Sequence, residues 1–188
     1  MSKRKHLIYG AITLIVIVIS SVFCNNMYSI NRMQKSQIIK ENQAKWNLIY
    51  EMTQEIETYF VKSDDWTKVD QFWVYVNGVT HYDGMKTLEP QFTSHFLAVH
   101  YDRLFSSLCV DDECLIGYEE EGFQIFSDMN KELKQISKSV LEKIDRGENF
   151  LDPESKEYQE TSKELQEFCQ KYEEAINELY EKAAEEHN

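Results

Sequence analysis

An uncharged run of 17 residues extends from Leu7 to Phe23, directly behind a Lys-Arg-Lys cluster near the start of the chain. No Asp, Glu, Lys or Arg occurs from His6 to Asn31, which gives about 25 membrane-compatible residues where a spanning helix needs roughly 20. The basic cluster predicts the orientation, because positive residues beside a first hydrophobic helix stay on the cytoplasmic side. We therefore expect three parts in a plasma-membrane protein: a cytoplasmic segment 1–6, a transmembrane signal anchor 7–29 and an extracytoplasmic domain 30–188.

Two other fates of this segment stay open. A secretory signal shares the basic start and the apolar centre, but cleavage needs small residues, and Phe23 occupies such a place. The same residue disfavours a lipoprotein in which Cys24 carries the lipid. In the anchored form about six residues remain inside, too few for an output domain, so a message across the membrane would need a partner protein.

The part of the chain beyond the anchor is strongly acidic. The whole sequence has 20 Lys plus Arg and 33 Asp plus Glu, and the first 31 residues hold three bases and no acids, so residues 32–188 carry a net charge of −16. Such a surface repels phosphates and anionic lipid headgroups, which excludes nucleic acid as an expected partner. It favours a basic partner or weakly bound divalent cations, although the charge can also serve solubility alone.

Apolar spacing predicts an all-α bundle of four or five helices, and no strand alternation of useful length is present. The chain has only six Gly and two Pro, which favours long helices. The apolar stripes recur mostly at steps of three and four. Their members are Ile38, Ile39, Trp46, Ile49, Met52, Ile56, Tyr59 and Phe60; Trp66, Val69, Phe72, Trp73 and Val76; Phe92, Phe96, Leu97, Leu104 and Leu108; Phe126, Met129, Leu133, Ile136, Val140 and Ile144; and Tyr158, Leu165, Phe168, Tyr172, Ile176, Leu179 and Ala183.

Capping residues, glycine and proline predict where these helices begin and end. The first helix can continue directly from the anchor, residues 63–65 resemble an N-terminal cap, and Asn77-Gly78 suggests a stop. Pro90 suits the first turn of the third helix, Gly147 ends the fourth, and Asp152-Pro153 suits the start of the last.

The last two helices should pack as a long antiparallel hairpin, because only about eight residues join them. Both carry a heptad-like seam of about three repeats, as in a coiled coil. The seam can be buried inside the bundle or serve a homodimer, and the sequence leaves both open. Pairs such as Glu167 with Lys171 and Glu178 with Lys182 are expected on the outer face.

Three cysteines lie beyond the anchor, where disulfides persist. A Cys109–Cys114 bridge would clamp a helix junction and contribute about 2 kcal/mol through loop entropy. Two unpaired core thiols are the alternative, and the spacing differs from the C-x-x-C of redox or zinc motifs. Cys169 follows Phe168 on the last helix and is expected to be a packing residue.

The sequence contains no P-loop, dinucleotide fingerprint, G-x-S-x-G or H-E-x-x-H pattern, so we expect no enzyme activity, no catalytic residues and no cofactor. The strongest metal hypothesis places His81 and Asp83 in an irregular loop that bends toward His100 or Asp102. His95 and His100 are five residues apart and therefore do not share a helix face. The acidic residues 111–113 and 119–121 lack the order of a calcium loop.

Aromatic residues make up 13% of the chain and are dense between Trp46 and Tyr75. Bundles use such side chains to line ligand pockets between helices, although ordinary cores use them as well. The residues that would line such a pocket are Trp66, Phe72, Trp73 and Tyr75.

Three functions therefore compete. The first is a single-pass membrane protein whose external bundle binds another membrane or envelope protein. The second is a sensor-like module that binds a ligand and works with a separate membrane partner. The third is a metal-dependent hydrolase built around His81. Single-anchor helical bundles are common, so the architecture alone does not separate them.

Overall fold

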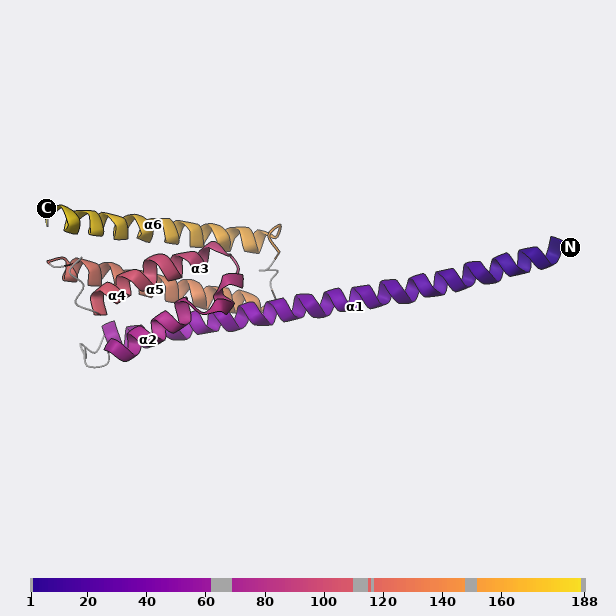
Figure 1. Ribbon diagram of the computed structural model, residues 1–188, viewed down its shortest axis with the longest axis horizontal. Helices are drawn as coiled ribbons and strands as arrows, with labels where there is room; N and C mark the ends of the chain where they lie inside the picture. The colour runs from indigo at the N-terminus through magenta and orange to yellow at the C-terminus, as the bar shows by residue number, and fades with distance from the viewer. Residues whose placement is uncertain (1, 62–68, 110–114, 116, 148–151, 187–188) are drawn as a thin grey trace. The chain divides into compact units, whose positions relative to one another are not determined.

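The structure is a computed structural model that describes residues 2–61, 69–109, 115, 117–147 and 152–186 (Figure 1). Within these ranges the side chains of residues 2–16, 18, 61, 69–72, 109 and 186 are outside the description. The predicted cap at residues 63–65 also falls outside it.

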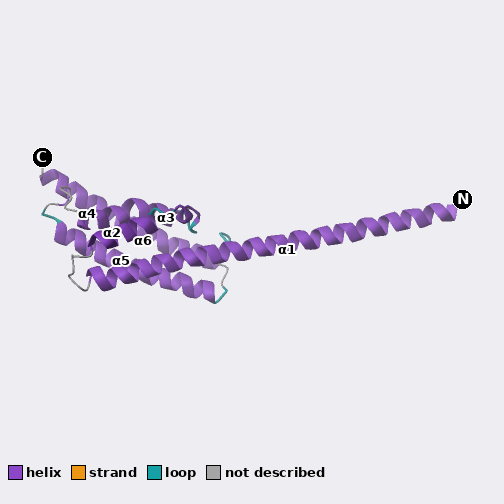
Figure 2. Cartoon of the chain, turned by 60° about the horizontal axis from the view of Figure 1, so that its bottom comes forward, coloured by secondary structure: helices purple, strands orange, loops and turns teal. Residues whose placement is uncertain are grey.

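Every regular element in the described ranges is helical, and none is a strand (Figure 2). The described residues form five helices, because α3, a π-helical turn and α4 follow one another without a break. This confirms the predicted all-α class. In chain order the elements are α1 (Ser2–Ile56) continued by a π-turn (Glu57–Val61), α2 (Val69–Thr80), a 3-10 turn (Asp83–Thr87), α3 (Phe92–Phe96), a π-turn (Leu97–Tyr101), α4 (Asp102–Cys109), α5 (Glu119–Asp145) and α6 (Lys156–Glu186).

The chain divides into two compact units, Met1–Glu41 and Asn42–Asn188. The first contains the beginning of α1, and the large apolar side chains described there are exposed from Ile17 to Ile38, while Ile39 is half-buried. Among the described residues, no helix is long and apolar enough to cross a membrane. In the predicted anchor 7–29, the side chains of residues 7–16 and 18 lie outside the described part, so the anchor stays a prediction.

The described residues of the second unit share one hydrophobic core, and most of the predicted stripe residues that are described belong to it. Ile38 and Tyr59, which the spacing also placed on an apolar face, are instead 49% and 48% exposed. Phe60 lies edge-on to Phe105 and Phe126, with ring centroids 5.1 and 5.9 Å apart. Fully buried side chains come from α1, from the α3–α4 segment, from α5 and from α6, so each contributes apolar area to the same interior. They include Trp46, Ile49, Met52, Ile56, Leu97, Leu104, Phe126, Met129, Leu133, Val140, Leu165, Phe168, Ile176 and Leu179.

A buried polar chain crosses this core. The Tyr101 hydroxyl donates to Asn130 Oδ1 at 2.6 Å, and the Asn130 amide donates to the Thr53 carbonyl oxygen at 3.0 Å. The three residues are almost completely buried and come from three different segments. The buried polar groups that form this chain therefore have hydrogen-bond partners, as buried polar groups in proteins generally do.

Helices α5 and α6 form the predicted antiparallel hairpin (Figure 1). As residue numbers rise along α5, those of their partners on α6 fall. The bonds that show this are Lys182 to Glu121 at 2.8 Å, Lys171 to Glu132 at 2.6 Å and Lys143 to Thr161 at 2.7 Å. The ammonium groups of Lys171 and Lys182 thus bond to α5 and not to the expected Glu167 and Glu178. Glu178 still acts on Lys182 at longer range, since it raises the pKa of Lys182 together with the larger effect of Glu121.

Two predicted boundaries also differ. Helix α2 continues past Asn77-Gly78 to Thr80, because Val79 and Thr80 are buried and hold the last turn against the core. Helix α6 begins at Lys156, and its cap is Ser155, whose hydroxyl accepts the Tyr158 amide at 3.1 Å.

Candidate functional site

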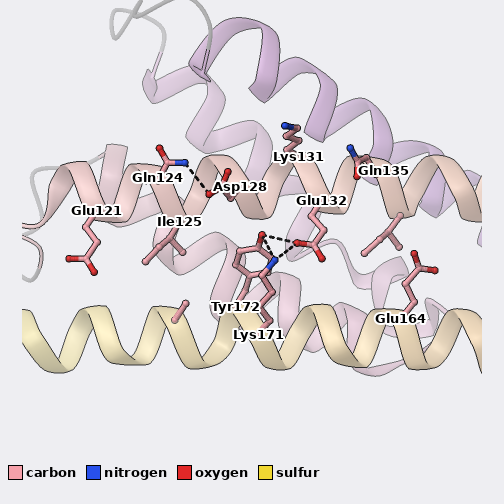
Figure 3. A pocket seen from close by; sticks show the side chains of 12 residues that line it. Glu121, Gln124, Ile125, Asp128, Lys131, Glu132, Gln135, Glu164, Lys171 and Tyr172 are labelled. Atoms are coloured by element: carbon pink, nitrogen blue, oxygen red, sulfur yellow. Dashed lines mark hydrogen bonds and ion pairs between the residues drawn. The ribbon is translucent and has the colours of Figure 1, made fainter.

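A groove of about 670 Å³ runs along the surface between α5 and α6 (Figure 3). Its base is apolar, with Ile136 and Tyr172 each 4% exposed and with Ile125 and Ala175 half-buried. Polar side chains surround that base: Glu121, Gln124, Asp128, Lys131, Glu132, Gln135, Glu164 and Lys171.

The centre of the groove is a three-residue cluster that joins the two helices. Glu132 Oε2 accepts from Lys171 Nζ at 2.6 Å and from the Tyr172 hydroxyl at 2.9 Å. Lys171 Nζ also lies 3.2 Å from the Tyr172 oxygen and 4.5 Å from the ring centroid. A carboxylate, a phenol oxygen and an aromatic face therefore surround one ammonium group, which is a favourable environment for a cation.

The cluster also affects the ionisation of its members. Burial and the hydrogen bond to Glu132 raise the pKa of Tyr172 to about 12, so its hydroxyl stays a donor at neutral pH. The hydrogen bond to Glu132 is the largest cause of a raised pKa for Lys171, so that side chain is a cation throughout the physiological range. The phenol and the ammonium group of the cluster therefore keep their protons near neutral pH.

Acidic groups outnumber basic ones in the groove. Asp128 lies one turn before Glu132 on α5 and accepts from Gln124 at 3.0 Å, and Glu164 faces the groove from α6. Of the two lysines in the lining, Lys171 is already bonded to Glu132. Glu121 is likewise paired with Lys182, at 2.8 Å, although Lys182 is not part of the lining. The groove thus combines an apolar base with a surround that has a small excess of negative charge.

The loop that carried the metal hypothesis brings His81 to Asp102. Their Nε2 and Oδ2 atoms are 3.3 Å apart, and Asn77 donates to the same oxygen at 3.3 Å. The other carboxylate oxygen of Asp102 is buried without a hydrogen-bond partner, since the Thr80 hydroxyl donates to the Val76 carbonyl at 3.0 Å. Beside His81 lies a smaller hollow of about 280 Å³ that His95 also lines.

The other proposed ligands point elsewhere. Asp83 is exposed and bonds to Lys86 at 2.7 Å, while His100 Nε2 lies 3.6 Å from Glu173 Oε1 on α6. Burial lowers the pKa of His100, which favours its neutral form. Within the part of the chain described, no three His, Cys, Asp or Glu side chains gather closely enough to hold a metal ion. The convergence that a hydrolase around His81 requires is therefore not seen there.

The residues of the predicted aromatic pocket are only partly described. Trp66 and the side chain of Phe72 lie outside the description. Trp73 is half-buried against the core and donates its indole N–H to the Ser106 hydroxyl at 2.7 Å, and Tyr75 is half-buried as well. Both of the hollows described above have other linings, so this pocket stays a prediction.

The cysteine predictions divide in the same way. The side chain of Cys109 and all of Cys114 lie outside the description, so their bridge stays a prediction, as do the acidic residues 111–113. Cys169 is 8% exposed, as expected of a packing residue. Burial, followed by Glu173, raises the pKa of its thiol to about 12, which keeps it protonated and unreactive.

Sequence reasoning did not single out the groove. Ile136 and Tyr172 belong to predicted apolar stripes and Lys171 to an expected pair on the outer face, while most of the other lining residues carried no prediction. The signal that could have found the groove was the density of charge beside the apolar seam of α6. Compared with family models, curated proteins and solved structures, the chain has no significant match in any of the three.

Proposed function

We propose that the protein is a single-pass membrane-anchored interaction module, which binds another membrane or envelope protein through the α5–α6 groove. The observation that carries the proposal is the groove itself: an open, elongated depression with an apolar base on a bundle whose described core is tightly packed. Protein-binding surfaces combine such an apolar centre with a polar rim.

The groove has the length of a protein segment. Its α5 side extends from Glu121 to Ile136, 15 residues apart, which corresponds to about 22 Å along a helix. Helix-in-groove recognition uses side chains at positions i, i+3, i+4 and i+7, which span about 10 Å of helix, so the groove is long enough for them. A short amphipathic helix of a partner fits these dimensions.

The anchor part of the proposal rests on the uncharged run of the sequence. Residues 7–29 would extend about 35 Å as a helix, enough to cross the hydrocarbon core. They fall within the continuous α1 helix, where the described side chains of Ile19 and Phe23 are 63% and 65% exposed. A bilayer would cover such side chains, with the amino terminus in the cytoplasm and the bundle outside.

Site-specific photo-crosslinking in the native membrane tests the interaction. A photoreactive residue replaces Gln135, which lines the groove and is exposed. The matched control replaces Gln170, an exposed α6 residue outside the groove lining. We expect one membrane or envelope protein to be crosslinked from position 135 in near-stoichiometric yield and not from position 170. Equal yields at both positions, or none at either, would overturn the proposal.

A further inference from the structure

Lys171 occupies a position in the groove that a cation from another molecule could take. Its Nζ is held by Glu132 and by the Tyr172 oxygen and ring (Figure 3). Its side chain is nevertheless 59% exposed. Glu132 is 36% exposed, so the carboxylate is reachable from the groove. An exposed ion pair is worth little, and an incoming cation can replace one of its members at small cost.

The acceptor side of this pair is more firmly held than the lysine. Tyr172 is only 4% exposed, and its hydroxyl donates to the Glu132 oxygen that also accepts from Lys171. If Lys171 left, the phenol would still hold the carboxylate in place beside an aromatic face. A preorganised acceptor of this kind suits a lysine or an arginine, because both form charge-assisted bonds and stack on rings.

The remainder of the groove points to a cationic segment of protein. Glu121, Asp128 and Glu164 lie along it, and the apolar residues Ile125 and Ile136 form part of its base. Glu121 is already paired with Lys182 at 2.8 Å, whereas Asp128 accepts, among the described residues, only from the neutral Gln124 amide. A small cation would gain nothing from the apolar base, and a neutral helix would bring no positive charge to Asp128 and Glu164. A basic amphipathic helix satisfies both.

We propose that the groove takes a basic amphipathic segment of a partner protein, and that Lys171 is a tethered competitor which the partner's lysine or arginine displaces from Glu132. This inference rests on the proposed function, since it names the chemistry of the segment that the groove binds. In the free protein Lys171 neutralises Glu132, and in the complex the partner's cation does so.

A binding titration with a defined probe tests the displacement. The probe is a fluorescent amphipathic peptide of about 15 residues, with leucine on one face and lysine on the other, long enough for the groove. A second peptide carries glutamine in place of each lysine. Anisotropy gives the Kd of the full-length protein in detergent micelles, at low salt and at about 0.15 M salt.

The decisive comparison is between Lys171→Met and Lys163→Met. Both remove one positive charge from α6, but Lys163 pairs with Glu167 at 3.6 Å and does not line the groove. We expect Lys171→Met to bind the lysine peptide up to about fivefold more tightly, because the exposed Lys171 no longer competes with the peptide for Glu132. Lys163→Met should stay within about twofold of the wild type, the scale of a remote, screened charge. Equal gains in the two variants would show a simple effect of net charge and overturn the inference.

Glu132→Gln provides the opposite test. It keeps the side-chain shape and removes the charge, so affinity for the lysine peptide should fall, by up to about fivefold for a pair this exposed. Should this variant fail to fold, as judged by its melting curve, the comparison of the two lysine variants still decides. Two results would overturn a basic protein segment as the occupant. One is equal affinity for the glutamine peptide and the lysine peptide. The other is competition by a polyamine such as spermine at the same concentration of positive charge as the lysine peptide.

The two proposals fail in different ways. If the lysine peptide ignores Lys171→Met while a protein is crosslinked from position 135, the interaction stands and the cationic partner is wrong. If the peptide binds as expected but no protein is crosslinked in the membrane, the groove has the proposed chemistry and the interaction module is wrong.

Discussion

Asp102 is a buried carboxylate at the contact between the end of α2 and the start of α4. Its residue is 6% exposed, one oxygen accepts from His81 and Asn77, and the other has no hydrogen-bond partner. Burial raises the pKa of Asp102, against the opposing effects of His81 and the hydrogen bonds. A group of this kind makes folding sensitive to pH.

The direction of that sensitivity follows from linkage. A carboxyl group whose pKa is higher in the folded chain binds its proton more tightly there. Its contribution to stability is therefore complete below the unfolded pKa of about 3.9 and is lost as the pH rises through the folded value. Ionisation of Asp102 places a charge in a site where one oxygen accepts from Asn77 and the other has no hydrogen-bond partner.

Asp102→Asn should therefore gain stability relative to the wild type as the pH rises. We expect the difference in the free energy of unfolding, variant minus wild type, to increase between about pH 4 and pH 7. Urea titrations at several pH values measure it. The control is Asp83→Asn, where the bond to Lys86 lowers the pKa of an exposed carboxyl, so the difference should not rise. A flat or falling difference for Asp102→Asn would contradict the cost of burying this charge.

The α5–α6 hairpin shows what periodicity predicts at the scale of an element and what it leaves out. The apolar positions of α6 from Leu165 to Ala183 are buried as their spacing predicts, because hydrophobic burial selects one face of a helix. The partners of Lys171 and Lys182 could not be predicted in this way. Spacing along the sequence identifies neighbours on the same helix only. The carboxylates that bond to Lys171 and Lys182 lie 39 and 61 residues away in the sequence.

Helix ends were predictable only where the backbone demands a particular residue. Gly147 follows α5 with a φ of +73°, a conformation that glycine adopts without strain. The start of α6 was less certain, since Asp152 and Ser155 are both good caps and lie three residues apart. Asp152 instead accepts the Glu154 amide at 3.1 Å in the preceding turn.

Two glycine substitutions test how the backbone conformation at a glycine affects the stability of the protein. Gly147→Ala should destabilise the protein by about 1–2 kcal/mol, because a Cβ meets open space but the positive φ is unfavourable for alanine. Gly78→Ala lies inside α2, where a Cβ also meets nothing within 4 Å, and should stabilise by about 0.5–1 kcal/mol. Urea denaturation of both variants gives the two changes. The same sign for both would contradict the backbone argument.

At the scale of the whole molecule, the beginning of the bundle is fixed by a clamp that no local pattern reveals. Trp46 donates its indole N–H to the Glu89 carbonyl at 3.1 Å, and Asn42 Oδ1 accepts the Glu89 amide at 2.9 Å. Tyr158 donates to the Glu89 carboxylate at 3.1 Å. Three segments far apart in the sequence thus meet at one loop residue. The sequence marked Trp46 as apolar core but could not assign its hydrogen-bond partner.

The candidate site was predictable to a similar degree. His81 was expected to reach either His100 or Asp102, and the structure shows the second pairing. The helix that carries His100 instead turns its imidazole toward Glu173 on α6. Which pairing forms depends on how α2, α4 and α6 pack together, and one-dimensional spacing does not contain that information.

The position of Asn42 predicts where the chain can be shortened. In the described part every buried hydrophobic side chain lies at Trp46 or later, and the compact second unit begins at Asn42. A chain of residues 42–188 keeps the core, Asn42 and Trp46, so we expect it to fold cooperatively, with a free energy of unfolding within about 0.5 kcal/mol of the full-length value.

The matched truncation, residues 47–188, removes the clamp as well as the completely buried indole of Trp46. Loss of a buried aromatic side chain costs about 3–5 kcal/mol, to which the unpaired amide and carbonyl of Glu89 add. Urea unfolding followed by circular dichroism compares the two truncations with the full chain. If residues 42–188 unfold as easily as residues 47–188, the preceding part of α1 contributes to the stability of the bundle. If only the chain of residues 47–188 is less stable than the full chain, Asn42 and Trp46 mark the beginning of the folded unit. The preceding residues are then free to serve as an anchor.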